Sequence, residues 1–440
     1  MPWTFPRTIH SLALLATAAG CFLPSLLALA SEPGAGDVPS MLGGGNIRVP
    51  PRAEQFETLA RIGAGMCRIP IHPNDYYRDG RPSPERIDQA VLMAHRHGIT
   101  PMLLFEYYTR FHGELGDEAR WRAIGRAFAA RFRPGSEWLK SEGVEDWGIA
   151  VYTAVNEPMW KDNNPTPIPV DRYVAALRGL ASGVRSVDAG LLVGPGGFQE
   201  VPLFQNRNPY AKAVVPLLND GTLQGIDIHR YWDVQYVPMQ ETNRFSLQSQ
   251  FDRVKRDLAI TADIAFWCTE FNFKKRLVTE EEAARGFLTA VWDAVGIVGN
   301  EGQPVTRFAL PWNVFHTAER DPHYGMAQSD APWRPTARGE VLVLVCRLGK
   351  GLRWVSLDPR AEGLFVLEGE GRRLWVWQNR KGWTRRPGAS ITLTGIPPGA
   401  RRLEIYAWDG LRRTVALAGQ ATLPLDELPT EQTLMFLAAP

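Results

Sequence analysis

Residues 148–160 read GIAVYTAVNEPMW, an apolar run that ends in Asn156, Glu157 and a proline. Residues 264–273 read IAFWCTEFNF, and Glu270 lies near the end of this second run. Apolar runs of this length, rich in β-branched and aromatic residues, are typical of strands that are buried on both faces. A carboxylate that closes such a run is costly to bury unless it has a partner or a role. The two stretches therefore predict two buried strands, each presenting one carboxylate at its end.

Six further runs of the same kind lie on both sides of these two. The eight candidate strands span residues 41–47, 66–71, 101–107, 148–156, 191–197, 226–231, 264–271 and 307–313. The first of them is glycine-rich and has the weakest strand pattern. The strands are short and regularly spaced, which is typical of a sheet whose neighbouring strands are joined by helices.

Amphipathic helical patterns separate the candidate strands. The pattern at 84–97 has Ser83 as a candidate N-cap, and the pattern at 280–298 opens with Thr279 and Glu282 in capping-box spacing. Alternating strands and helices predict a parallel sheet, and eight such units over about 300 residues fit a closed barrel better than an open sheet. No GxGxxG motif follows a strand, so the dinucleotide-binding alternative lacks its fingerprint. We expect an α/β fold, a (β/α)8 TIM barrel over residues 41–350.

The pattern changes from about residue 351 onward. Short alternating runs such as RLWVWQ and RRLEIYAW recur there with glycine and proline between them, and no helical periodicity is evident. This arrangement is typical of a small antiparallel sandwich. We therefore expect residues 351–440 to form a C-terminal antiparallel β-sandwich domain that accompanies the barrel.

The first 30 residues have the pattern of a signal peptide. Arg7 precedes an apolar run, and a small-x-small motif ends at Ala30, after which residues 31–40 form a polar linker. We expect cleavage after Ala30, secretion or periplasmic location, and no stable membrane insertion of the mature protein. Lipid attachment at Cys21 is the less favoured alternative, because the residues after Cys21 continue the apolar segment.

Composition excludes several classes of function. The formal net charge is +2, and no long basic run suggests a nucleic-acid partner.

Cleavage after Ala30 leaves three cysteines, each in an apolar run, so buried free thiols are expected rather than a disulfide framework. His95 and His97 lie two apart on a predicted helix and point in different directions, so no metal site is expected. No GxSxG motif is present, and we expect no cofactor.

The two glutamates match a known arrangement. Asn-Glu-Pro at the end of the fourth strand and Thr-Glu-Phe in the seventh resemble clan A of the glycoside hydrolases, over roughly residues 40–350. The resemblance implies that Glu157 is the general acid/base and Glu270 the nucleophile. Two carboxylates across a cleft are also what glycoside hydrolysis requires, since one protonates the leaving oxygen and the other attacks the anomeric carbon.

The same resemblance implies roles for neighbouring residues. Asn156 would hold the sugar 2-hydroxyl, and Tyr231 would donate a hydrogen bond to the nucleophile. His229 lies two residues before Tyr231, on the same face of the sixth strand, and would belong to the same polar network. Arg68 on the second strand resembles the buried arginine that supports the nucleophile.

Three aromatic residues are candidates for contact with substrate. Trp312, near the end of the eighth strand, resembles the tryptophan that forms the floor of the subsite for the reacting sugar. Trp160 and Tyr107 follow the fourth and third strands and could line the cleft, because aromatic faces stack on sugars. Packing in the core is the alternative for all three.

Structural roles are the alternatives for the remaining candidates. Asn-Glu-Pro could be a turn at a strand end, and Glu270 could pair with Lys274 or Lys275. His229 and Tyr231 could be ordinary core residues, and Arg68 a plain salt-bridge partner.

The sequence therefore favours a retaining β-glycosidase that acts on an oligosaccharide or polysaccharide, with bacterial exopolysaccharides among the candidates. The resemblance is greatest to family 39, whose members commonly carry a C-terminal sandwich, and family 5 is the alternative. Val155 stands where many relatives have tryptophan. A non-catalytic carbohydrate-binding protein and a transglycosylase on the same barrel remain as alternatives.

Overall fold

The computed structural model describes most of the chain after the first 35 residues. The described residues are 36–47, 49–109, 117–162, 164–199, 203, 206–233, 246–274, 279–315, 324–328, 333–358, 364–378, 390–417, 421–424, 428 and 432–439. The predicted signal peptide, Cys21 and Lys275 lie outside the described residues. No helix in the described ranges is both long and apolar enough to cross a membrane.

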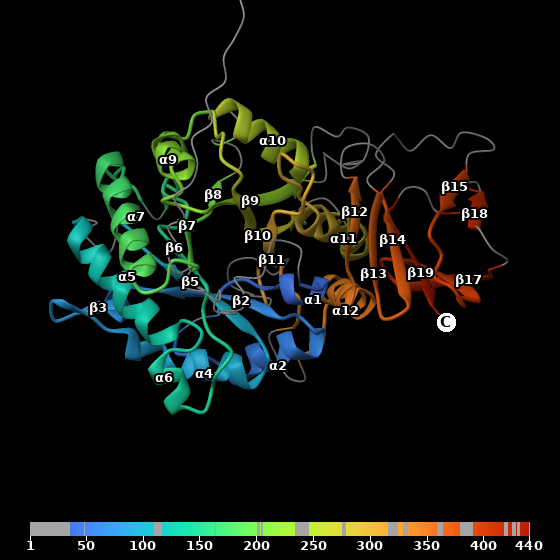
Figure 1. The fold of residues 1–440 in the computed structure, drawn as a ribbon, viewed down its shortest axis with the longest axis horizontal. Coiled ribbons are helices and arrows are strands. Elements are labelled where there is room, and N and C mark those ends of the chain that lie inside the picture. The colour runs from blue at the N-terminus through green and yellow to red at the C-terminus, as the bar shows by residue number, and fades with distance from the viewer. Residues whose placement is uncertain are drawn as a thin grey trace, which may run out of the picture.

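Eight parallel strands form the barrel (Figure 1). They are β1 (Gly43–Gly44), β2 (Met66–Ile71), β5 (Thr100–Phe105), β6 (Val151–Ala154), β7 (Leu192–Pro195), β9 (Gly225–Asp233), β10 (Ala265–Lys274) and β11 (Thr306–Pro311). One continuous ladder runs β1-β2-β5-β6-β7, and another runs β11-β10-β9 with the short β8 (Phe198–Gln199) at its edge.

Contacts at the two seams join these ladders into a closed barrel. A parallel bridge pairs Leu42 with Ala309, beside β1 and β11. Between β7 and β9, the amide of Gln224 donates to the carbonyl of Val193 at 2.9 Å. The predicted (β/α)8 barrel is therefore confirmed, and its strand ends share one rim as the fold requires.

A helix follows each barrel strand and covers the outside. These helices are α2 (Ala53–Ile62), α4 (Asp88–Arg96), α5 (Glu118–Phe132), α7 (Val170–Arg185), α9 (Pro209–Asn219), α10 (Leu247–Asp257), α11 (Glu280–Val295) and α12 (Ala337–Gly349). Several begin where a polar side chain caps the free amides of the first turn. Thr279 and Glu282 form the predicted capping box of α11.

Two apolar layers hold the barrel together. A large cluster fills the space between the strands and the helices, and it includes buried Cys67, Cys268 and Cys346, which are free thiols as predicted. A smaller cluster fills the barrel interior, and its buried members are Met66, Met102, Val151, Trp267, Phe308 and Leu310. The interior cluster closes one end of the barrel, so polar side chains are placed toward the carboxyl ends of the strands.

The C-terminal part is an antiparallel sandwich, as predicted. Its main sheet has the order β12-β13-β14-β19-β16-β17. Its strands are β12 (Arg353–Asp358), β13 (Leu364–Gly369), β14 (Arg372–Trp377), β16 (Arg402–Ala407), β17 (Gly410–Ala416) and β19 (Leu434–Ala439). A two-stranded sheet of β15 (Ser390–Leu393) and β18 (Ala421–Pro424) packs against one face of this main sheet.

The main sheet stands beside α11 and α12 (Figure 1). Val376 and Met435 are fully buried in the same cluster as the apolar faces of these two helices. The hydroxyls of Thr289 and Thr433 lie 2.7 Å apart, and the amide of Gln378 donates to the carbonyl of Thr289 at 3.1 Å. The barrel and the sandwich therefore share one continuous core.

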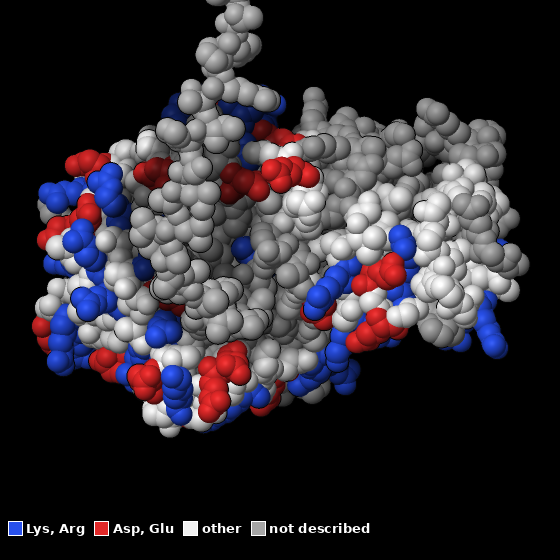
Figure 2. Space-filling view, viewed as in Figure 1, with Lys and Arg blue, Asp and Glu red and all other residues white. Residues whose placement is uncertain are grey.

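Charges of both signs cover the barrel helices on the face seen in Figure 2. Lysine and arginine side chains alternate there with aspartate and glutamate, and several form ion pairs one helical turn apart, such as Arg122 with Glu118 at 3.1 Å. Neither sign dominates this face.

Two local predictions differ from the structure. The predicted strand 41–47 contains only the two-residue β1, because a short helix, α1 (Val38–Met41), begins before it, with Asp37 capping the amide of Ser40. The predicted helix 84–97 begins as a 3-10 turn, Pro84–Ile87, and Ser83 makes no side-chain cap bond. Both differences arise where a proline near a helix start sets the local backbone.

Candidate active site

Glu157 lies in the turn that follows β6. The turn has an unusual backbone: Val155 has φ of 64° and Glu157 has φ of 42°. Positive φ is uncommon for residues other than glycine, costs about 1–3 kcal/mol, and gathers at functional sites. The amide of Glu157 donates to the carbonyl of Gly197 at 2.9 Å, which fixes the turn against the next strand. The turn that Asn-Glu-Pro suggested in the sequence is therefore present, and it directs the Glu157 carboxyl group into the open end of the barrel.

Glu270 lies within β10, and an irregularity in the strand directs it. The registers of β10 with β9 and with β11 both shift between the positions before and after Glu270. An extra residue in a strand bends it locally and re-aims a side chain. The side chain of Glu270 is 10% exposed and accepts hydrogen bonds from Arg68 and Tyr231, the latter at 2.7 Å. Arg68 and Tyr231 are thus its partners, while Lys275 and the side chain of Lys274, the ion-pair candidates in the sequence, lie outside what the structure describes.

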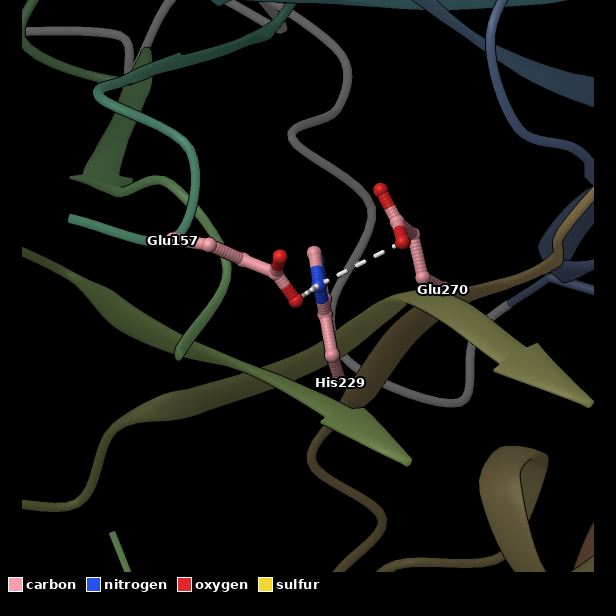
Figure 3. Close-up of side chains that lie close together, drawn as sticks. All are labelled: Glu157, His229 and Glu270. Atoms are coloured by element: carbon pink, nitrogen blue, oxygen red, sulfur yellow. Dashed lines mark hydrogen bonds and ion pairs between the residues drawn. The ribbon is translucent and has the colours of Figure 1, made fainter. Parts of the chain in front are cut away.

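His229, on β9, stands between the two glutamates (Figure 3). Its Nδ1 lies 2.8 Å from Glu157 Oε1 and 3.6 Å from Glu270 Oε2. The imidazole is 1% exposed, and its close approach depends on Gly197, where a Cβ would lie 1.7 Å from Nε2. Only glycine at position 197 leaves room for the ring.

The hydrogen bonds around Thr269 indicate that Nε2 of His229 carries a proton. The Thr269 hydroxyl has one proton, which it donates to Asp227 Oδ2 at 2.6 Å. Its lone pairs then accept from Arg68 Nη1 at 2.8 Å and from His229 Nε2 at 3.0 Å. Nδ1 is hydrogen-bonded to the Glu157 carboxyl group at 2.8 Å, and it donates there when the ring is an imidazolium. An imidazolium at this position fits a buried ring that faces several carboxylates.

The pKa of His229 agrees with this assignment. Burial lowers the pKa, but the charge of Glu270, the hydrogen bond to Glu157 and the charge of Asp227 outweigh burial and raise it to about 9. The ring therefore stays positively charged at neutral pH.

The pKa values of the two glutamates are shifted in opposite directions. Burial raises the pKa of Glu157, and His229 only partly offsets the rise. Burial also opposes ionisation of Glu270, but the charges of His229 and Arg68, with hydrogen bonds from Arg68 and Tyr231, hold its pKa below the ordinary value. Glu157 thus keeps a proton more readily than Glu270 does. Two titratable groups whose pKa values are pushed apart are the mark of an acid and a nucleophile.

Arg68 connects Glu270 to the rest of the rim. It is 1% exposed, and besides Glu270 and Thr269 it donates to Asn46 Oδ1 at 2.6 and 3.0 Å. Its Nη1 also lies 3.4 Å from Asn156 Oδ1, which places Asn156 at the edge of the same network. Asn156 is 8% exposed and lies directly beside Glu157.

An aromatic wall stands next to Glu270. The rings of Tyr231 and Tyr324 lie 5.6 Å apart, and those of Tyr324 and Trp312 lie 5.7 Å apart. Asn272 donates from its amide to the carbonyls of Trp312 and Tyr324 and so ties the wall to β10. Trp312 is half-buried rather than a core residue, and its peptide bond to Asn313 is cis.

The other two aromatic candidates differ in position. Trp160 is 43% exposed, and its backbone amide donates to the carbonyl of Glu157 at 2.8 Å. Trp160 therefore lies at the surface, close to Glu157. Tyr107 is 4% exposed and belongs to the apolar cluster behind the strands. Of the nine candidate site residues, Tyr107 is the one whose surroundings favour a packing role.

Sequence reasoning missed three polar residues of this rim. Asp227 and Thr269 are fully buried partners of His229 and Arg68, and Glu106 closes the third strand run with 5% exposure. Glu106 gave the same signal as Glu157 and Glu270, a carboxylate at the end of a long apolar run. Asp227 and Thr269 are short side chains inside strands, and the sequence holds no signal that separates them from ordinary strand residues.

Glu157, His229 and Glu270 also offer oxygen and nitrogen atoms that lie within 4.8 Å of one another, a spacing that could hold a metal ion. A metal requires a free lone pair on the imidazole, so the ring must lose a proton before it can bind one. The pKa of His229 is raised, which keeps the ring protonated, and the Arg68 guanidinium is already bonded to Glu270. The arrangement suits proton transfer better than cation binding.

Comparison with known proteins supports the fold. No family model matches the chain, and no curated protein matches it in sequence. A family 39 glycoside hydrolase from Bacteroides cellulosilyticus WH2 is similar, with a TM-score of 0.58 and 15% identity over 91% of this chain and 82% of that one.

Two further solved structures are similar to most of the chain. A glucosidase from Croceicoccus marinus has a TM-score of 0.64 and 11% identity, over 93% of this chain and 98% of that one. A family 51 alpha-L-arabinofuranosidase from Bifidobacterium longum has a TM-score of 0.55 and 14% identity, over 91% and 96%. These likenesses show that the chain has the fold of such hydrolases, a barrel followed by a β-sandwich. The expected resemblance to family 39 is confirmed at the level of the fold.

Proposed function

We propose that this protein is a retaining β-glycoside hydrolase of clan A that cleaves an oligosaccharide or polysaccharide by double displacement. The observation that carries the proposal is the pair of glutamates. Their nearest oxygens lie within 4.8 Å, and their surroundings raise the pKa of Glu157 while they lower that of Glu270. Retaining glycosidases place their two carboxyl groups about 5–5.5 Å apart, whereas inverting enzymes leave room for a water at about 6.5–9.5 Å.

The chemistry follows from these states. Glu157 donates its proton to the glycosidic oxygen while ionised Glu270 attacks the anomeric carbon, so the bond to the leaving group breaks as a glycosyl–Glu270 ester forms. Glu157, now a carboxylate, takes a proton from water, and the hydroxyl attacks the same carbon and releases Glu270. Arg68 and Tyr231 keep Glu270 ionised before attack and hold its leaving carboxylate afterwards. The half-buried Trp312 offers a flat face on which the reacting sugar can stack.

The resemblance to family 39 suggests the substrate class. The family 39 and family 51 structures carry a barrel and a sandwich like this chain; the first is described as a glycoside hydrolase and the second as an alpha-L-arabinofuranosidase. A β-linked glycan is therefore the first substrate to test, with bacterial exopolysaccharides included in the set.

The decisive experiment measures hydrolysis of 4-nitrophenyl β-glycosides and bacterial exopolysaccharides by the wild type, Glu157→Ala and Glu270→Ala. We expect Glu270→Ala to abolish turnover, and Glu157→Ala to lower it by about 10²–10⁴-fold, because general acid catalysis contributes that much. Proton NMR of the first product should show the β-anomer. An α-anomer as first product, or full activity in Glu270→Ala, would overturn the mechanism.

Further outcomes separate the alternatives. Tight glycan binding without turnover on the whole set would indicate a binding protein, and transfer of the sugar to an added alcohol in preference to water would indicate a transglycosylase.

We also propose that the protein acts outside the cytoplasm. The signal-peptide pattern of the first 30 residues supports export, with cleavage after Ala30. N-terminal sequencing of the exported protein should begin at Ser31. A mature chain that begins at Cys21 and carries a lipid would replace this proposal with membrane anchoring.

A further inference from the structure

Glu106 is a third buried carboxyl group at the rim of the barrel. It directly follows β5, and its backbone is fixed: its amide donates to Ile71 at 2.9 Å, and its carbonyl accepts from the hydroxyl of Tyr76 at 3.0 Å. Side chains two residues apart on a strand share a face. Met102, on the same strand, points into the barrel interior, so Glu106 points into the barrel as well, at its open end.

The carboxyl group of Glu106 faces the catalytic groups. The charges that act on it belong to Arg68, His229 and Glu270, on β2, β9 and β10, and to Glu157 in the turn after β6. Glu106 therefore lines the space in which the reacting sugar would lie, on the side of β5.

Glu106 has no hydrogen-bond partner for its buried Oε2 among the residues that the structure describes. The residue is 5% exposed, so bulk water has little access to this oxygen as a hydrogen-bond partner. Arg68, whose charge acts on Glu106 more strongly than that of His229, is already bonded to Glu270, Asn46 and Thr269. A buried polar atom without a partner is unfavourable and rare in native proteins, and such atoms often belong to functional sites.

We propose that Glu106 is a substrate-binding residue that holds a hydroxyl group of the sugar bound between Glu157 and Glu270, and that it thereby helps to select the sugar. The inference rests on the proposed function. A protonated carboxyl group offers one donor and one acceptor, which matches an uncharged sugar hydroxyl.

The electrostatic surroundings support a neutral ligand at this position. Burial is the main cause that raises the pKa of Glu106 to about 8, so at neutral pH the group is an uncharged acid. The charged Arg68 and His229 would repel an ammonium group on the sugar. A neutral pyranose hydroxyl therefore fits better than an amino sugar.

The test uses the 4-nitrophenyl β-glycoside that the wild type cleaves best, together with its 2-, 3-, 4- and 6-deoxy analogues where the sugar has those hydroxyls. Wild type, Glu106→Leu, Glu106→Gln and Glu270→Ala are compared by kcat and KM. Met102→Ala is the matched control, because it loosens the same strand on the same face without touching the rim.

We expect Glu106→Leu to lower kcat/KM on the parent glycoside by about 10- to 100-fold, because the hydroxyl loses its partner in a buried site. For one deoxy analogue, the one that lacks the bound hydroxyl, Glu106→Leu should match the wild type within about 2-fold. Glu106→Gln should lose much less than Glu106→Leu, since an amide also donates and accepts. Met102→Ala should treat all the glycosides alike.

A loss in Glu106→Leu that is equal for the parent and every deoxy analogue would overturn the inference, because it would indicate a structural role. An unchanged kcat/KM on the parent would overturn it too. Full activity of Glu270→Ala would overturn the proposed function while the deoxy series still judged Glu106. If the wild type cleaves no glycoside, fluorescently labelled wild type and Glu106→Leu are compared on a glycan array. Binding lost in the variant supports the inference, whereas equal binding, or none by either protein, overturns it.

Discussion

At the scale of single residues, the site depends on one buried cation placed between two acids. His229 contacts Glu157 and Glu270 with the same nitrogen, at 2.8 and 3.6 Å, while its other nitrogen is fixed by Thr269. The charge of His229 lowers the pKa of both carboxyl groups. Of the two glutamates, Glu270 is the one that accepts hydrogen bonds from Arg68 and Tyr231. The distinction between shared and unshared partners gives a test in solution.

Replacing His229 with glutamine should shift the whole pH profile of kcat/KM upward. Without the imidazolium the pKa of Glu270 rises, so the acidic limb moves up, and the pKa of Glu157 rises, so the alkaline limb moves up as well. Each shift should be about one pH unit, at the lower end of what a neighbouring charge produces. The measurement is kcat/KM from pH 3 to 10.

Tyr231→Phe is the matched control for His229→Gln. It removes one hydrogen bond from Glu270 and none from Glu157, so only the acidic limb should move up. An alkaline limb that stays in place in His229→Gln would show that His229 does not act on Glu157.

At the scale of elements, the long apolar runs made the barrel predictable, because a strand buried on both faces has few alternatives. β2 was predicted at its observed bounds, and Glu157 and Glu270 were recognisable as charges that close such runs. The irregular features were not predictable. The positive φ of Val155 and the register shift at Glu270 arise from tertiary contacts, and nothing in the local sequence signals them.

The rim shows the same limit. Glu106 follows a strand in the way the two glutamates do, and what singles it out is an unpartnered buried oxygen, which only the assembled rim reveals. Tyr107, the next residue, was the candidate for substrate contact in the sequence, and it belongs instead to the apolar cluster. Two neighbouring residues on a strand point to opposite faces, so an error of one position exchanges site and core.

The capping box of α11 gives a prediction about stability at this scale. Thr279→Ala removes the side-chain oxygen that accepts from the amide of Glu282 and should lower the free energy of unfolding by about 1 kcal/mol. Urea unfolding followed by tryptophan fluorescence measures the change. Thr279→Ser keeps the oxygen and should retain most of the stability. Equal losses in the two variants would mean that the methyl group, rather than the cap, contributes the stability.

At the scale of the whole molecule, the sandwich covers the apolar faces of α11 and α12 as part of one core. The bonds among Thr289, Thr433 and Gln378 tie the two parts together, and the ring of Trp292 on α11 packs against Trp354 on β12 at 6.3 Å. Because the buried layer is continuous, we expect the barrel and the sandwich to unfold together.

Val376→Asp tests this continuity, since it places a charge between the main sheet and the barrel helices, where Val376 is fully buried. An unpaired buried charge should cost more than about 3 kcal/mol. Tryptophan fluorescence and loss of activity should give the same lowered urea midpoint. Thr414→Asp, on the exposed face of β17 in the same sheet, should change the midpoint little. Activity that survives to the wild-type midpoint in Val376→Asp would show that the barrel folds independently.

The place of β19 in the main sheet has a consequence for how the protein is made. β19 comes after every other strand in the sequence, yet it lies in the middle of the sheet and pairs with both β14 and β16. Until the ribosome has added residues 434–439, the sheet exists only as two separate halves. Before these six residues are added, the apolar sides of α11 and α12 are incompletely covered in the nascent chain and prone to aggregation. A protein that lacks the six residues should be degraded by proteases more readily than the full chain.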